Sequence, residues 1–233
     1  MTKLKKPIKI ILIGKIKKFL KMKNKRLDFK NTDQLQKQID RIQPLVFSRF
    51  EKDKEFFYLD LLNIGLLNRT YELVETSIWA LKKDRPQTTA HMLRGLIETL
   101  AFIYYWASKI GEANSNQDKN ELVKAALFGT RDKSTKFESI NILSCLKKAK
   151  ERFPNLEDNY KDVCELVHPN SSSHFHFLKA TREGKSALAI IPFYEFKEKD
   201  RERSLNQIGE CAFHIINIAE LYLVSISQPK PTN

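Results

Sequence analysis

Three of the chain's five histidines, His168, His174 and His176, lie close together in the stretch CELVHPNSSSHFHF at residues 164–177. Histidine changes its charge near neutral pH and is the commonest metal ligand, so this stretch could transfer protons or bind a metal. Proline, asparagine and three serines separate the histidines. The stretch is therefore either a catalytic or metal-binding loop, or the polar end of a helix whose ring nitrogens already have hydrogen-bond partners.

A metal site here would depend on Glu165 and His168, which are three residues apart on a helix expected to end near Pro169. Carboxylate-bridged di-iron bundles use this spacing, but they need two copies of it and two further glutamates. The chain has one copy, and His174 and His176 would add ligands only if their loop folded back. We therefore expect no metal ion and no cofactor.

A second pair of chemically active side chains lies in a long apolar segment, where Arg94 and Glu98 are one helical turn apart. A buried charge without a partner is strongly unfavourable, so these two must pair with each other or with nearby polar groups. Either they form a structural ion pair, or they line a polar pocket in which Arg94 holds an anion and Glu98 orients a base. His91, one turn before Arg94, could join either arrangement. We expect Glu98 to be mostly buried.

The elements that would position these residues are mostly helices. Glycine makes up only 7 of 233 residues, and long stretches rich in Leu, Ile, Lys and Glu favour helix formation. The helix that carries Arg94 is expected at residues 86–109, in the centre of a bundle, because it is apolar on almost all sides. Further helices are expected at 31–43, 52–83, 121–129, 137–153, 156–168 and 200–227. The sequence thus predicts a mostly α-helical bundle with a small β-hairpin or extended flap near residues 176–194.

The net charge of +13 belongs almost entirely to the N-terminal residues. Residues 1–30 hold 12 Lys and Arg and one acid, Asp28, a net charge of +11. The other 203 residues hold 29 basic and 27 acidic groups, a net charge of only +2. We divide the chain into a basic amphipathic extension at residues 1–30, a helical domain at 31–228 and a disordered tail at 229–233.

The extension is expected to form an imperfectly amphipathic helix, although Gly14 and a local Lys/Ile alternation leave a short strand open. Its apolar side would carry Ile8, Ile11, Leu12, Ile16, Phe19 and Leu20, with Lys17, Lys18 and Lys21 opposite and Lys9, Lys15 and Lys23 at its margins. Such a helix can lie on an anionic membrane, dock on a partner, bind RNA or another polyanion, or pack on its own domain.

Two features bear on the compartment of the protein. The apolar run from Ile10 to Ile13 is too short to span a membrane. The three cysteines are widely spaced, which suits buried thiols in a reducing cytosol better than disulfides. We expect a cytoplasmic protein, peripherally attached to a membrane if the extension binds lipid.

Two motifs carry a resemblance to a known family. One is Arg94-x3-Glu98 in the central helix, and the other is Tyr160-x3-Cys-Glu-Leu-Val-His168-Pro-Asn-Ser. Together they resemble a bacterial and phage-associated helical family, domain of unknown function family 5677. That family shows a Tyr-x3-Leu-Ser-x3-His sequence before a polar loop, and the resemblance covers residues 50–225. It implies a fold distantly similar to HEPN domains, many of which are RNases in toxin–antitoxin and anti-phage defence systems and pair as homodimers. On this resemblance we expect His168, Arg94 and Glu98 to be catalytic, and Tyr160, Glu165, Asn170 and His174 to bind the ligand.

The chain departs from the HEPN nuclease motif, which is an arginine followed four to six residues later by a histidine. Asp162, Val163 and Cys164 stand where that arginine would precede His168. An asparagine, Asn170, precedes His174 by four residues. A site would therefore have to be assembled across helices, from Arg94 and His168.

Two hypotheses about function follow from these observations. The first is an RNA-associated HEPN-like effector, a metal-independent RNase in which His168 transfers a proton and Arg94 stabilises phosphate charge. The second is a non-catalytic interaction module, attached to an anionic membrane or to nucleic acid through the basic extension. The first requires Arg94 and His168 to converge on one open pocket, whereas the second predicts that they are buried or far apart.

Overall fold

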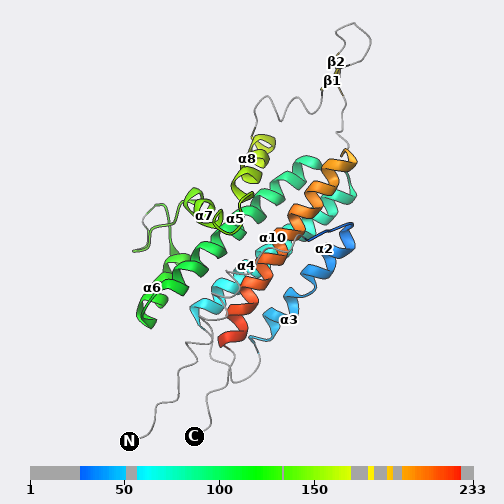
Figure 1. Ribbon diagram of the computed structural model, residues 1–233. Helices are drawn as coiled ribbons and strands as arrows, with labels where there is room; N and C mark the ends of the chain where they lie inside the picture. Colours follow the sequence, from blue (N-terminus) through cyan, green and yellow to red (C-terminus); the bar gives the residue numbers. More distant parts are fainter. Residues whose placement is uncertain are drawn as a thin grey trace, which may run out of the picture.

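The computed structural model describes residues 27–50, 57–132, 134–168, 178–180, 188–190 and 196–226, and these form a mostly α-helical bundle, as the sequence predicts (Figure 1). The helices are α2 (Thr32–Ile39), α3 (Ile42–Phe47), α4 (Tyr58–Lys82), α5 (Pro86–Glu112), α6 (Asn116–Phe128), α7 (Ile142–Ala149), α8 (Leu156–Val167) and α10 (Glu198–Ile226). Some expected site residues lie outside the described residues: Asn170, His174, Lys9, Lys15, Lys17, Lys18, Lys21 and Lys23.

Helix α5 occupies the centre of the bundle, as predicted. It packs against α4, α6, α7, α8 and α10, and 15 of its 27 residues are buried. Pro86 stands in its first turn, where a fixed φ and a missing N–H fit the start of a helix. Arg85 is the N-cap of this helix, and Asp84 before it adopts a φ of 50° and binds Arg201.

Helix α10 is fastened to the α4–α5 pair near both of its ends. Close to its start, Arg201 donates a hydrogen bond of 2.7 Å to the carbonyl of Leu81, in the last turn of α4. Close to its other end, the buried hydroxyl of Tyr222 donates to the carbonyl of Ala107 at 3.0 Å. The three long helices therefore form one rigid core, and α2 packs against both α4 and α10.

The segment before α2 also packs on this core. The ring of Phe29 is 6% exposed, and its backbone N–H donates to Asn206 Oδ1 at 2.7 Å. Gly209 of α10 makes this close packing feasible, because a Cβ at that position would lie 2.3 Å from Phe29 Cδ2. Phe29 therefore belongs structurally to the helical body, although the sequence places it in the basic extension.

Several helix boundaries differ from the expected ones, and two of these differences have clear local reasons. The first helix was expected to continue to Pro44, but it ends before α3, and Pro44 lies in the first turn of α3, where a missing N–H breaks no helical bond. Helix α6 begins within a stretch expected to be a loop. There Ser115 Oγ accepts the N–H of Asp118 at 3.0 Å and the Asp118 carboxylate accepts the N–H of Ser115, which is a capping box.

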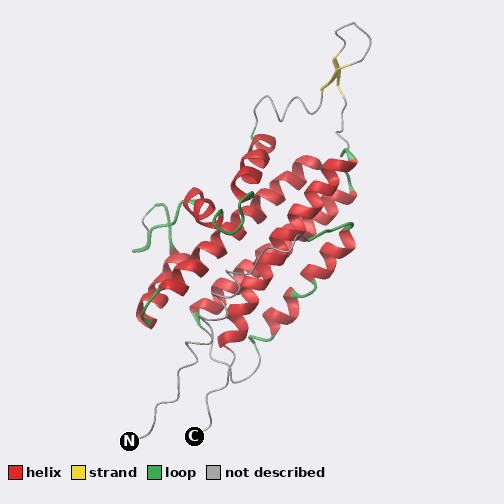
Figure 2. Cartoon of the chain, viewed as in Figure 1, coloured by secondary structure: helices red, strands yellow, loops and turns green. Residues whose placement is uncertain are grey.

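The predicted hairpin is represented by two short strands, β1 (Leu178–Ala180) and β2 (Leu188–Ile190). They pair antiparallel, with Leu178 opposite Ile190. Figure 2 shows them beyond the end of the bundle at which α8 ends and α10 begins. The hairpin therefore stands apart from the apolar core.

Candidate functional site

The clearest polar arrangement on the central helix joins Arg94, Glu98 and Tyr160, which we call the polar cluster. Arg94 Nε donates to Glu98 Oε1 at 3.0 Å, which confirms that the two residues pair directly. The hydroxyl of Tyr160 donates to the same Glu98 oxygen at 3.1 Å, and Arg94 Nη2 donates to the Tyr160 hydroxyl at 3.4 Å. The three side chains thus form a closed triangle of hydrogen bonds.

The local sequence explains why Tyr160 reaches this triangle. Leu156, Tyr160 and Val163 are buried and follow one another at helical steps of four and three residues, so they share the face of α8 that meets α5. Figure 1 shows α8 lying against the half of α5 that begins at Pro86. The Tyr160 ring also lies 5.6 Å from the guanidinium carbon of Arg94, a cation–π contact.

The polar cluster is partly buried, and its charges are balanced. The side chains of Arg94 and Glu98 are 32% and 27% exposed, so Glu98 is about as buried as the sequence led us to expect. Burial raises the pKa of Tyr160 to about 12, and the negative charge of Glu98 acts in the same direction. The phenol therefore stays protonated and serves as a donor to Glu98. Because the guanidinium already faces a carboxylate, little of its charge remains for an external anion.

His168 is not part of the polar cluster. It is the C-cap of α8, its backbone N–H donates to the carbonyl of Cys164 at 2.9 Å, and it is exposed. Eight residues separate it from Tyr160, a rise of about 12 Å along a helix. Among the described residues, no hydrogen bond or ion pair joins His168 to Arg94 or Glu98. Glu165 lies on the exposed side of α8.

The cysteines provide no activated nucleophile near the cluster. Burial raises the pKa of Cys145 to about 11 and that of Cys211 to about 12, so both thiols are protonated at neutral pH. Cys164 is half-buried and lies one turn after Tyr160 on α8.

A small cavity lies in the interior of the bundle, away from the polar cluster. A cavity of ≈ 10 Å³ lies between α4, α5 and α10, lined mainly by leucine and isoleucine with Asn63, Trp106 and Tyr222. That volume suits one water molecule. None of the residues of the polar cluster lines it. Within the described part of the chain, no group of three His, Cys, Asp or Glu side chains is placed to hold a metal ion.

The strongly interacting pair of Arg49 and Asp60 was not predicted from the sequence. They form a buried ion pair between the end of α3 and the first turn of α4. Arg49 stands two residues before a charged run at residues 51–55, a context that does not indicate burial. The available signal was Asp60 itself, an isolated acid between apolar residues early in a long helix.

Comparison of the chain with models of protein families, with curated proteins and with solved structures gave no match. The resemblance to domain of unknown function family 5677 and to HEPN domains therefore stays a prediction. Arguments about function have to be made from the residues of the chain itself.

Proposed function

We propose that the protein is a binding module that attaches to a polyanionic surface through its N-terminal segment, with the helical body as a stable, non-catalytic domain. The observation that carries this proposal is the distribution of charge. Residues 1–26 hold 11 Lys and Arg and no acid, whereas the rest of the chain is almost neutral. Binding that neutralises phosphates releases counterions, so lysines concentrated in one segment give strong, salt-dependent affinity.

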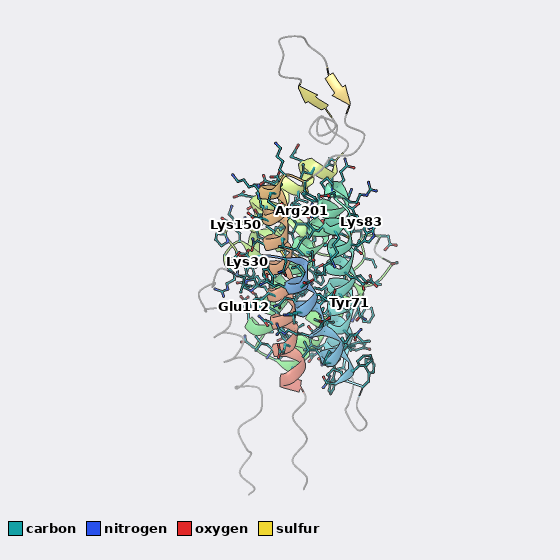
Figure 3. All side chains as sticks on the ribbon, turned by 90° about the vertical axis from the view of Figure 1, so that its right-hand side faces the viewer. Lys30, Tyr71, Lys83, Glu112, Lys150 and Arg201 are labelled. Carbon is teal, nitrogen blue, oxygen red and sulfur yellow. The ribbon has the colours of Figure 1, made fainter. Side chains whose placement is uncertain are left out.

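The helical body offers a polyanion much less net charge than the N-terminal segment does. Figure 3 shows charged side chains such as Lys83, Lys150 and Arg201 on the outside of the bundle. Many of the basic groups there are engaged by acids: Arg41 by Glu220, Arg94 by Glu98, Lys150 by Glu157, Arg201 by Asp84 and Arg203 by Asp162. The polar cluster in particular acts as a structural tie between α5 and α8.

Two variants that lose the same number of lysines, one in the N-terminal segment and one in the helical body, test the proposal. One variant carries glutamine in place of Lys9, Lys15, Lys17, Lys18, Lys21 and Lys23, and the control carries glutamine in place of six exposed body lysines, Lys37, Lys82, Lys83, Lys147, Lys197 and Lys199. Retention on heparin and the salt dependence of binding to a labelled RNA are measured for both. The first variant should lose most binding and the control little. Equal losses would overturn the proposal, because net charge alone would then decide.

The RNase hypothesis is the second candidate, and one observation favours it. Helix α8 packs on α5, which places Arg94 and the exposed His168 on adjacent helices. Incubation with RNA in the presence of a chelator tests it, using His168→Ala and Arg94→Ala beside the unchanged protein. Cleavage that both substitutions abolish would replace the binding module by an RNase. An anti-phage role and a homodimer rest on the resemblance alone and would accompany that outcome.

We propose that the protein is located in the cytoplasm, on the polyanionic surface that residues 1–26 bind. No helix among the described residues is long and apolar enough to cross a membrane. The three cysteines are free, two of them buried. Free thiols of this kind suit a reducing compartment.

A further inference from the structure

A group of exposed apolar side chains marks the end of the bundle at which α3 ends and α4 begins. We call this group the aromatic edge: Phe47 (66% exposed), Phe50 (62%), Phe57 (47%), Tyr58 (47%), Leu61 (46%) and Phe128 (42%). It contains six of the eight large apolar side chains that are exposed among the described residues; the other two are Trp79 and Leu143. Such gathering of exposed aromatic rings is typical of an interaction surface.

Local contacts bring members of the aromatic edge close to one another. The N–H of Phe50 donates to the carbonyl of Phe47 at 3.0 Å, so these two rings belong to one turn. The N–H of Leu61 donates to the carbonyl of Phe57 at 3.3 Å, one turn into α4. Tyr58 meets Phe128 of α6 edge to face, with ring centroids 5.7 Å apart.

The two halves of the aromatic edge are fixed to each other by a buried contact. Arg49, beside Phe50, forms an ion pair with Asp60, and Asp60 accepts the N–H of Phe57 at 2.8 Å. Because Arg49 and Asp60 are buried, the neighbouring rings are held outward on a rigid base. Because the backbone that carries these rings is already fixed, little conformational entropy is lost when the aromatic edge binds a partner.

The N-terminal segment can reach this end of the bundle. The described segment before α2 lies beside α10, where Phe29 bonds Asn206, and α2 and α3 lead from there toward the start of α4 (Figure 1). From Thr32 to Phe47 the helical rise is about 24 Å, whereas 26 residues of helix span about 39 Å. The basic segment and the aromatic edge can therefore meet one flat surface at the same time.

We infer that this surface is an anionic lipid bilayer, with the lysines of residues 1–26 on the headgroups and the aromatic edge at the level of the upper acyl chains. This inference rests on the proposed polyanion binding and names its target. Aromatic rings favour the membrane interface, and basic amphipathic helices lie in it. Both the segment and the edge present apolar groups, which phosphate backbones would leave exposed to water.

The charges around the aromatic edge argue against a single-stranded nucleic acid as its occupant. Stacking platforms for single strands combine aromatic rings with a positively charged groove that follows the backbone. Here Lys124 lies over Tyr58 but pairs with Glu121 at 2.9 Å, and Lys136 pairs with the same carboxylate at 3.3 Å. The two lysines therefore share the single negative charge of Glu121, which leaves a net charge of only +1 for the three side chains. A bilayer needs only the apolar contact there.

Flotation with lipid vesicles tests the inference on the full chain. Vesicles of phosphatidylcholine alone and of phosphatidylcholine with phosphatidylglycerol are compared at low salt and at ~1 M salt, where the Debye length is about 3 Å. The edge variant Phe47→Gln/Phe50→Gln/Leu61→Gln is matched by Trp79→Gln/Leu143→Gln, which removes exposed apolar groups elsewhere. Circular dichroism and melting temperature confirm that each variant is folded.

We expect the unchanged protein to bind the anionic vesicles and to keep part of that binding at high salt. The edge variant should bind about tenfold more weakly at high salt, and the control should match the unchanged protein. Equal vesicle binding by the edge variant and the control would overturn the inference and leave polyanion binding standing. So would binding to RNA and heparin without vesicles. Failure to bind vesicles, heparin and RNA alike would overturn the proposed function itself.

A fluorescent reporter gives an independent readout. Phe50→Trp is introduced together with Trp79→Phe, which leaves Trp106 as the other tryptophan, a buried one. Brominated lipids in the anionic vesicles should quench the new tryptophan at position 50. Binding without quenching would show that the segment alone contacts the bilayer, and the aromatic edge would then be excluded from the contact.

Discussion

The guanidinium of Arg49 and the carboxylate of Asp60 form a forked ion pair sealed inside the protein. The distances from Nε to Oδ1 and from Nη2 to Oδ2 are both 2.8 Å, and the two side chains are 1% and 0% exposed. Asp60 also accepts the N–H of Phe57, so one carboxylate joins the end of α3 to the start of α4. A buried pair of this kind is sensitive to the loss of either residue, because the other is then left as an unpaired buried charge.

We predict that removing one partner of this pair is far more harmful than removing both. Asp60→Asn or Arg49→Met should lower the free energy of unfolding by about 3–5 kcal/mol, because each leaves a buried group without its partner. The double variant Arg49→Met/Asp60→Leu should recover much of that loss. Urea denaturation measures all three. Arg203→Met, which removes an exposed arginine from Asp162, is the control and should change little.

The contact between Phe29 and Gly209 yields a second prediction. A Cβ at Gly209 would lie 2.3 Å from the Phe29 ring, so Gly209→Ala should displace that ring and destabilise the protein by about 1–3 kcal/mol. Gly65→Ala is the matched control, because nothing lies within 4 Å of a Cβ there and alanine favours helix. In a Phe29→Ala background the cost of Gly209→Ala should vanish. A cost that persists in that background would place the clash elsewhere.

How well each feature could be predicted depends on the sequence separation of its partners. Arg94 and Glu98 are four residues apart on one helix, so periodicity alone predicts that they can pair. Arg49 follows α3 whereas Asp60 lies in α4, and Phe29 and Gly209 come from opposite ends of the chain. No local pattern encodes such contacts, because they depend on how whole helices pack. The aromatic edge was missed because residues 57 and 58 were expected inside a helix from 52, whereas α4 begins at Tyr58.

The buried position of Phe29 predicts that two N-terminal truncations, which differ only in residues 27–30, affect stability differently. Deletion of residues 1–26 should leave the melting temperature unchanged while removing polyanion binding. Deletion of residues 1–30 also removes Phe29 from the core, where loss of a phenylalanine side chain costs about 3–5 kcal/mol, and should lower the melting temperature clearly. Calorimetry of both truncated proteins makes the comparison. Equal stability of the two would mean that Phe29 contributes nothing to the core.

The polar cluster should behave as one structural unit. Glu98→Gln should destabilise the protein by about 1–2 kcal/mol, because Arg94 and Tyr160 lose a charged acceptor, and Tyr160→Phe should cost about 1 kcal/mol. Combined, the two should cost less than their sum, since both remove the same hydrogen bond. Glu75→Gln, in the exposed Tyr71–Glu75 pair, is the control. Strict additivity would show that the triangle does not exist in solution.

The last prediction concerns His214 on α10, which is 9% exposed and lies against Phe153 with ring centroids 4.8 Å apart. Within the described part of the chain its buried Nδ1 has no hydrogen-bond partner. Burial lowers the pKa of His214 to about 4, and the positive charge of Arg152 acts in the same direction. The folded protein therefore keeps this ring neutral at a pH where the unfolded chain, with an ordinary histidine pKa of about 6.5, binds a proton.

The sign of the pH dependence follows from that difference. Above about pH 6.5 neither state is protonated, so the stability is fully present, and it is lost as the pH falls from about 6.5 to about 4. Between pH 7.5 and pH 5 the loss due to His214 should be about 2 kcal/mol. Carboxylates also contribute to acid destabilisation, so the informative quantity is the difference between the unchanged protein and His214→Leu. Urea denaturation at both pH values should show a smaller loss for His214→Leu, whereas the exposed control His91→Gln should match the unchanged protein. An identical loss in His214→Leu would mean that the ring is protonated in the folded state.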